Sequence, residues 1–257
     1  MTRKTLRLSA VVPDGDTAII GCVVLVLDDK PVEIELVVPA GMVAFDATLP
    51  ILHQLTDFIV VRETASAEAS GQAISCRAGC GACCRQLVPI SQAEARSLVR
   101  LVAKMPEPRR TQVRRRFIAA LEALDEVGLL AAIDSAREDP SGTFGDLGMR
   151  YFRQGIACPF LEEESCSIYI DRPLVCRQYL VTSPARNCED PSPGTIKTVP
   201  LPVKPSQALL LADSIDSLVT WMPLTYALTF DEQVPPNSPM RTAPDILRDV
   251  FSRFADK

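Results

Sequence analysis

Two cysteine-rich segments constrain this sequence more than any other feature. The first reads Cys76-x3-Cys80-x2-Cys83-Cys84, and the second begins at Cys158 about seventy residues later. The second segment contributes four more cysteines: Cys158, Cys166, Cys176 and Cys188. Together the segments hold eight of the nine cysteines of the chain. Where no export signal is recognised, such clusters indicate metal ligands rather than structural disulfides.

Neither segment is expected to complete a metal site alone. A closed thiolate site needs about four sulfurs that converge on one point. Cys83 and Cys84 are neighbours, so we expect their side chains to diverge, with one serving a given metal and the other a second site or the core. The second segment must then supply the missing ligands. This arrangement predicts that metal binding is coupled to folding, and it leaves open one centre with spare thiols or two centres.

The local sequence suits an anionic centre. Gly79 and Gly81 would let backbone N–H groups approach sulfur closely. Asp171 and Pro173 have the character of a helix start, which would place Cys176 near a helix N-terminus and favour its thiolate form. Four arginines near the cysteines would offset the negative charge of the centre: Arg77, Arg85, Arg172 and Arg177.

Other interpretations of the first segment fit less well. The C-x3-C-x2-C spacing is that of radical S-adenosylmethionine enzymes, but Ala82 stands where those enzymes usually have an aromatic residue, and no repeated β/α pattern follows. A thioredoxin-type dithiol would need a strand before the motif and a helix after it. The spacing also differs from that of a ferredoxin. The only histidine, His53, lies far from both segments, which excludes a site of two cysteines and two histidines.

Taken together, the two segments resemble the YkgJ-type family of zinc- or iron-chelating proteins, over roughly residues 74–190. This resemblance implies a cysteine-bound iron–sulfur cluster or zinc. Flagellin lysine N-methylases carry a related cysteine pattern, but this chain is short for one and has no recognisable S-adenosylmethionine site. The resemblance rests on these residues: Cys76, Cys80-Gly81-Ala82-Cys83-Cys84, Cys158-Pro159-Phe160-Leu161, Cys166-Ser167-Ile168-Tyr169, Asp171-Arg172-Pro173, Cys176-Arg177 and Tyr179.

We therefore predict a metal-binding protein. An iron–sulfur cluster, [4Fe–4S] in particular, is narrowly favoured over zinc, since an all-sulfur ligand set suits either. One alternative is a cluster-dependent oxidoreductase or a protein-modifying, methylase-like enzyme; another is a zinc-stapled interaction module. No motif assigns a catalytic residue, a substrate or a partner. The expected metal ligands are Cys76, Cys80, Cys83, Cys158, Cys166 and Cys176, followed by Cys84 and Cys188.

Composition and charge limit the partners and the cellular location that we expect for this protein. The net charge of −5 over 257 residues argues against broad nucleic-acid binding. No apolar run is as long as a membrane span. The basic start of the chain is followed by an apolar stretch that Arg7 and Ser9 interrupt, so we expect no secretory signal and a cytoplasmic protein. We interpret the basic stretch 109–116 and the acidic run 162–164 as solvated surfaces.

The hydrophobic pattern predicts an α+β fold. Residues 1–45 should form a small antiparallel β-meander, because residues 32–36 alternate apolar and acidic side chains. Residues 46–190 should form a mainly helical domain around the cysteine-rich metal site, with a helical insert at 91–137. A proline-rich segment and helices should fill residues 191–257. The pattern predicts strands near 6–12, 19–27 and 32–36, and helices near 49–72, 92–105, 108–127 resuming to 133, 206–221 and 244–255. Residues 13–16 should form a turn between the first two strands, and the S-x-x-E spacing of Ser91 and Glu94 predicts a capping box at the start of the second helix.

Overall fold

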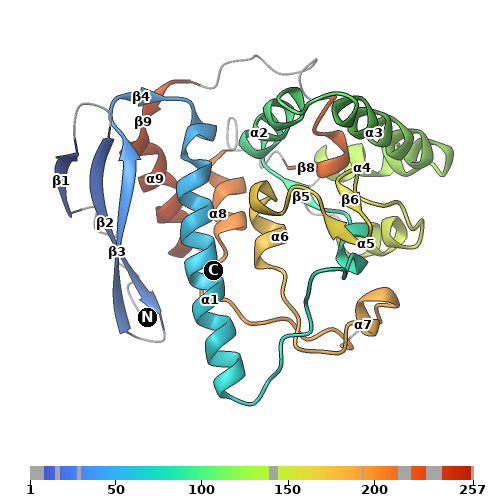
Figure 1. Cartoon of the computed structure of the whole chain (residues 1–257), viewed down its shortest axis with the longest axis horizontal. Coiled ribbons are helices and arrows are strands. Elements are labelled where there is room, and N and C mark those ends of the chain that lie inside the picture. Colours follow the sequence, from blue (N-terminus) through green and yellow to red (C-terminus); the bar gives the residue numbers. More distant parts are fainter. Residues whose placement is uncertain are drawn as a thin grey trace.

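The structure is a computed structural model of the whole chain. It describes residues 9–14, 18–27, 30–138, 144–192, 194–213, 221–229 and 239–255. Helix α1 (Leu49–Ala69) stands between an N-terminal sheet on one side and a group of helices on the other (Figure 1). This arrangement confirms an α+β fold that is mainly helical after the sheet.

The N-terminal sheet is the predicted antiparallel meander. Its strands are β1 (Ser9–Asp14), β2 (Ala18–Leu27) and β3 (Lys30–Pro39), with β2 in the centre. Along β3, Leu36 and Val38 are buried, whereas Val37 is exposed. This period of two is typical of a strand that covers a core with one face. Pro13 and Asp14, which we predicted to form a turn, instead pair with β2.

The two ends of the described chain share one hydrophobic core. Leu52, Leu55 and Ile59 of α1 are almost fully buried in the same cluster as residues of the sheet and of two C-terminal helices. These helices are α8 (Pro205–Ala212) and α9 (Ala243–Ser252). The short strands β4 (Met42–Val43) and β9 (Arg241–Thr242) also pair, antiparallel. The C-terminal helices therefore supply apolar side chains that pack with those of the sheet in one core.

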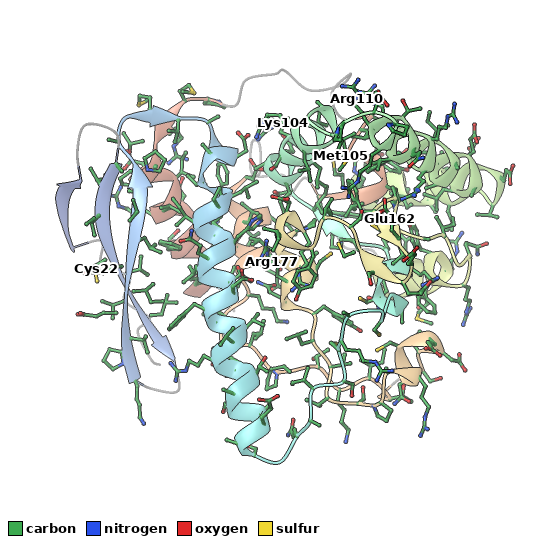
Figure 2. The ribbon with its side chains drawn as sticks, in the orientation of Figure 1. Cys22, Lys104, Met105, Arg110, Glu162 and Arg177 are labelled. Atoms are coloured by element: carbon green, nitrogen blue, oxygen red, sulfur yellow. The ribbon has the colours of Figure 1, made fainter. Side chains whose placement is uncertain are left out.

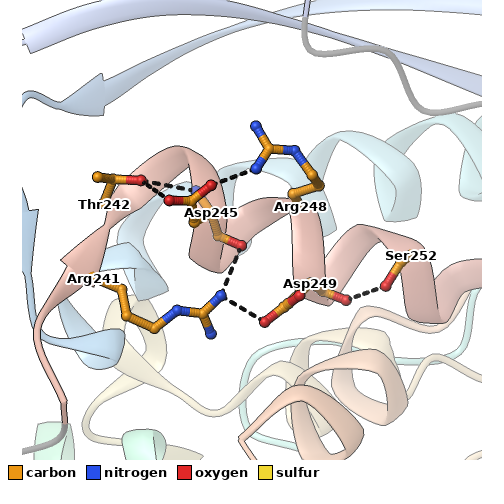
Figure 3. A network of polar contacts seen from close by, with 6 residues as sticks. All are labelled: Arg241, Thr242, Asp245, Arg248, Asp249 and Ser252. Carbon is orange, nitrogen blue, oxygen red and sulfur yellow. Dashed lines mark hydrogen bonds and ion pairs between the residues drawn. The ribbon is translucent and has the colours of Figure 1, made fainter.

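A polar network fixes the start of α9 (Figure 3). The Thr242 hydroxyl accepts a hydrogen bond from the Asp245 backbone N–H at 3.2 Å and donates one to the Asp245 carboxylate at 2.6 Å. Arg248 pairs with the same carboxylate, and Arg241 pairs with Asp249 at 2.7 Å. A threonine cap satisfies a backbone N–H that the first turn of a helix leaves without a partner.

The helices on the other side of α1 surround the cysteine-rich segments. Helices α2 (Gln92–Ala103) and α3 (Arg109–Glu126) contact each other, as do α3 and α4 (Leu129–Glu138), and α4 and α5 (Phe144–Phe152). The rings of Phe117 on α3 and Phe160 meet edge to face, 5.3 Å between centroids. The insert thus packs directly on the second cysteine segment. The short strands β5 (Pro89–Ile90) and β8 (Met222–Pro223) pair, antiparallel, in the same part of the molecule.

Two helices differ from the sequence prediction. Helix α5 was not predicted, because Gly145 and Gly148 weaken the helical signal of this short stretch. Helix α8 ends at Ala212 and not near Trp221. The carboxylate of Asp213 accepts a hydrogen bond from the Ala93 backbone N–H on α2, at 2.6 Å. The end of α8 is thus anchored to another helix, and residues 214–220 of the predicted helix lie outside the described residues.

The other predicted helices are confirmed, with boundaries shifted by a few residues. The capping box predicted at Ser91 and Glu94 is present at the start of α2. Gly128, at a φ of 65°, separates α3 from α4. The boundaries of the three predicted regions stay a prediction. Among the described residues, no helix combines the length and apolar content needed to cross a membrane.

Candidate metal centre

All eight clustered cysteines line one cavity of about 490 Å³. Its walls come from residues 75–89, residues 158–188 and Leu224. The ninth cysteine, Cys22, lies in the sheet on the far side of α1 (Figure 2). The tertiary structure thus brings together both of the segments that the sequence analysis assigned to one site. All nine cysteines are free thiols.

The first segment reaches the cavity through a tight turn. The 3-10 helix η2 (Ala82–Arg85) carries Cys83 and Cys84, and the Cys84 backbone N–H donates to the Gly81 carbonyl at 2.9 Å. Both side chains line the same cavity. The expectation that they diverge is therefore wrong, because this short 3-10 turn does not place neighbouring side chains on opposite faces as a strand would.

The second segment supplies each cysteine from a different element. Cys158 lies in a turn, closed by the Leu161 N–H, which donates to the Cys158 carbonyl at 2.8 Å. The later elements are β6 (Leu161–Glu162), β7 (Ser165–Cys166), η3 (Tyr169–Asp171), α6 (Leu174–Gln178) and α7 (Arg186–Glu189). Cys176 lies on α6, and Cys188 lies on α7, where it is buried. Four cysteines from a turn, a short strand and two short helices thus line one cavity.

Hydrogen bonds fasten the two segments to each other. The Cys158 backbone N–H donates to the Cys84 carbonyl at 2.7 Å. The Gly79 N–H donates to the Ser165 hydroxyl at 3.2 Å. The Val181 N–H donates to the sulfur of Cys76 at 3.3 Å. These bonds join the backbones of the two segments at the cavity, while the thiol side chains keep freedom to rearrange.

An ion pair closes the same junction. The Arg85 guanidinium binds both carboxylate oxygens of Glu164, at 2.9 and 2.7 Å. Glu163 and Glu164 form the β6–β7 turn with positive φ values of 49° and 55°, a conformation that usually takes Asn or Gly. A Cβ atom at Gly81 would lie 2.5 Å from a carboxylate oxygen of Glu164 and 3.1 Å from its Cα. Only glycine permits this close approach.

The basic stretch on α3 supports the second segment. Arg109 donates to the Ser167 carbonyl at 3.0 Å, and Arg116 pairs with Glu162 at 2.9 Å. Figure 2 shows Glu162 below the helices of the insert. Both charged runs are partly exposed, as expected for solvated surfaces, but Arg116 and Glu162 also join one run to the other. These contacts link the helical insert to the hairpin that carries Cys166.

Two buried side chains position α6 and hence Cys176. Glu94, on α2, accepts a hydrogen bond from the Leu174 backbone N–H at 2.8 Å. Arg177 donates from one nitrogen to both carboxylate oxygens of Asp57 on α1, at 2.9 and 2.8 Å. Arg177 also donates to the Arg172 carbonyl at 3.1 Å. Figure 2 shows Arg177 beside α1. Helix α6 is thus held from both sides.

Comparison with known families gives one match. Residues 75–193 match the family model CxxCxxCC, described as a putative zinc- or iron-chelating domain. We call residues 75–193 the CxxCxxCC domain after this match. The match spans both cysteine segments and is consistent with the YkgJ-type resemblance. Neither the curated proteins nor the solved structures that were compared gave a match.

Burial keeps several thiols of the CxxCxxCC domain neutral. It raises the pKa of Cys158 to about 12 and that of Cys176 well above its ordinary value. Burial also raises the pKa of Cys166 and Cys188. Our expectation that a helix N-terminus favours the Cys176 thiolate is wrong, because desolvation outweighs the field of so short a helix. A bound cation would reverse this preference.

Arg172 is a positively charged residue of the cavity wall that favours the thiolate forms of two cysteines. Its guanidinium lies over the Tyr169 ring, 3.8 Å from the centroid, and Arg172 lines the cavity of the CxxCxxCC domain. Burial raises the pKa of Cys76 and Cys166, and the positive charge of Arg172 opposes this rise at both thiols. One of the four arginines predicted to offset the charge of the centre therefore acts on cysteines of both segments.

The described residues hold no preformed single-ion site. Among them, no three His, Cys, Asp or Glu side chains are arranged so that they could hold one metal ion. His53 lies on α1 and is not among the residues that line the cavity. Burial lowers its pKa to about 4. The only histidine of the sequence is therefore not a candidate ligand, as the sequence analysis predicts.

The residues that hold these thiols in place have no clear signal in the sequence. Glu94 was recognised as half of a capping box, but its bond to Leu174 joins residues that are distant in sequence. Arg85 was noted only as a charge near a cysteine, and its pairing with Glu164 was not foreseen. The one available signal was Gly81, since a glycine beside clustered cysteines indicates a close backbone approach.

Proposed function

We propose that the CxxCxxCC domain binds an iron–sulfur cluster through its cysteine thiols, with [4Fe–4S] favoured over zinc. The observation that carries this proposal is that all eight clustered cysteines line one cavity. Thiolates are the usual ligands of iron–sulfur clusters and of structural zinc. The family description, zinc- or iron-chelating, agrees with such a donor set.

The residues present fit such a group. Thiols raised in pKa by burial are neutral at pH 7, and a cation of sufficient charge would stabilise their thiolate forms. A cavity of about 490 Å³ leaves more room between the sulfurs than one coordinated ion fills, which supports a polynuclear cluster. When bound, an iron–sulfur cluster supplies one-electron transfer, whereas zinc supplies a structural cross-link.

Binding requires the thiols to move inward. No three of the described donor groups already surround one ion position, so the metal and the protein must adjust together, as expected where metal binding is coupled to folding. The cysteines that we expect to hold the metal are Cys76, Cys80, Cys83, Cys84, Cys158, Cys166, Cys176 and Cys188.

Metal analysis after anaerobic purification tests this proposal. We expect a brown protein with stoichiometric iron and sulfide. The Cys176→Ser variant should lose metal and stability together, whereas Cys22→Ser should keep full metal content, because Cys22 lies in the sheet. A colourless protein with stoichiometric zinc would show that the thiols bind zinc and not an iron–sulfur cluster. A protein without either metal would refute metal binding.

The size of the cavity favours a second candidate, an enzyme. Ligand pockets usually measure about 300–1,000 Å³, so this cavity has room for a small molecule beside a metal centre. A cluster-dependent oxidoreductase or a protein-modifying, methylase-like enzyme would use that space. Reversible reduction of the purified protein would support redox chemistry. A redox-silent protein with saturated zinc sites that unfolds on chelation would indicate the zinc-stapled interaction module instead.

A further inference from the structure

The cysteines of the cavity divide into two groups that pack against different cores. Cys188, Cys76 and Cys80 pack with Val181 and Ile196 in one small cluster. Cys158 and Cys166 pack instead against the larger core of Phe160, Ile168 and the helical insert. We call the first set, with Cys188 on α7, the α7 group. The second set, together with Cys176 on α6, is the α6 group.

The neighbours of each group support the same division. Helix α7, which carries Cys188, contacts η2. Cys188 lies near enough to Cys76, Cys80 and Cys83 for a thiolate at any of these positions to raise its pKa. Cys176 lies near Cys158, Cys83 and Cys166 in the same sense. Cys83 is the neighbour that both groups share.

The pair Cys83–Cys84 lies at the boundary between the groups. Both side chains line the cavity from adjacent positions on η2. The Cys84 carbonyl also accepts the hydrogen bond from the N–H of Cys158, which begins the α6 group. Each group contributes three thiols, one short of the four that a closed thiolate site needs. The pair contains two.

We propose that the eight thiols form two adjoining metal centres, one on the α7 group and one on the α6 group, with Cys83 and Cys84 completing them. This inference rests on the proposed function, because it assigns the ligands of the metal that the domain is proposed to bind. Arg172, which acts on Cys76 of one group and Cys166 of the other, lies where it offsets the charge of both centres. The cavity holds both centres side by side.

Titration of the reduced, metal-free full chain with Co²⁺ tests the division. Cobalt stands in for a tetrahedral metal, and its thiolate absorption reports binding. The wild-type protein should saturate at two equivalents, and alkylation followed by peptide mass spectrometry should find all eight thiols protected. Saturation at one equivalent, with four protected thiols drawn from both groups, would overturn the two-centre proposal while leaving metal binding intact.

Two variants then assign the centres. Cys188→Ser should saturate at one equivalent, half the wild-type value, and keep the thiols of the α6 group protected. Cys166→Ser should also saturate at one equivalent and protect the α7 group. Cys22→Ser should keep the wild-type value.

Loss of both equivalents in a variant whose circular dichroism is unchanged would overturn the proposal. If a variant unfolds, the number of cobalt equivalents that the wild-type protein binds tests the two-centre proposal without it. No cobalt–thiolate absorption in the wild type would overturn this proposal and the proposed function together.

Discussion

The carboxylate of Glu94 accepts a hydrogen bond from the backbone N–H of Leu174, 80 positions along the chain, at 2.8 Å. Its other oxygen accepts the Ser91 N–H at 2.9 Å. Glu94 is buried, so neither bond competes directly with bulk water. One side chain therefore fixes the starts of two helices, α2 and the α6 that carries Cys176. The position of this cysteine depends on an acid in the helical insert.

Replacing Glu94 should loosen α6. The Glu94→Ala variant leaves two buried backbone N–H groups without acceptors, which should lower the free energy of unfolding by about 2–4 kcal/mol. It should also reduce metal content, because Cys176 lies only two residues after Leu174 on α6. Urea denaturation and metal analysis measure both effects. The exposed Glu122→Ala on α3 serves as the control, and equal stability of the two variants would contradict this role.

The close contact at Gly81 predicts a steric effect. In Gly81→Ala, the new Cβ would meet the Glu164 carboxylate and backbone and the Leu161 side chain, at distances of 2.5 to 3.1 Å. The β6–β7 hairpin must then move away from the first cysteine segment. We expect a loss of roughly 1–3 kcal/mol in stability, as for other overpacked sites, together with reduced metal content.

Gly148→Ala is the matched control for that variant. Gly148 lies within α5, where a Cβ atom meets nothing within 4 Å. Alanine should leave stability unchanged or raise it by up to about 1 kcal/mol, since it favours the helix. Thermal unfolding of both variants gives the comparison. If Gly81→Ala were as stable as Gly148→Ala, the proposed approach of the hairpin would be wrong.

Asp213 should make stability depend on pH. Burial raises its pKa from 3.8 to about 6, so the folded state holds a proton that the unfolded state releases. The resulting stabilisation is complete below pH 4 and is lost as the pH rises through 6, with a magnitude of up to about 3 kcal/mol. Asp213→Asn removes this titration, so its stability relative to wild type should increase between pH 4 and 7. The exposed Asp125→Asn should show no such change in urea midpoints.

Metal binding should release protons. Burial raises the pKa of Cys158 to about 12 and also raises that of Cys166, so these thiols are protonated at pH 7. Each must lose its proton to become a ligand. Zinc titration of the metal-free protein in buffers of different ionisation enthalpy should therefore show about one proton released per bound thiol, and affinity should rise with pH. A pH-independent affinity would show that these thiols are not ligands.

Local patterns in the sequence were sufficient for several elements. The alternation at residues 32–36 predicted β3, and the S-x-x-E spacing at Ser91 predicted the start of α2. Such signals depend on neighbours along the chain, so no tertiary information is needed. The cysteine spacing and its neighbouring residues likewise indicated the family whose model matches residues 75–193.

Features that depend on contacts between distant residues could not be predicted from the sequence. Helix α5 forms despite two glycines, with Leu147 and Tyr151 buried against α4 and other residues. Asp213, at the end of α8, bonds to α2. The opposite charges of Arg116 and Glu162 were each interpreted as solvated until the fold placed them 2.9 Å apart. A sequence states which charges exist but not which of them meet.

The two cysteine segments show the same division. The sequence alone determined the donor chemistry: eight thiols, a single remote histidine, and spacing that no single segment completes. Only the tertiary structure decided that both segments line one cavity, that Glu94 and Arg177 hold the helix of Cys176, and that the thiols pack in two groups. Ligand type is a property of residues, whereas convergence is a property of packing between elements that lie far apart in the chain.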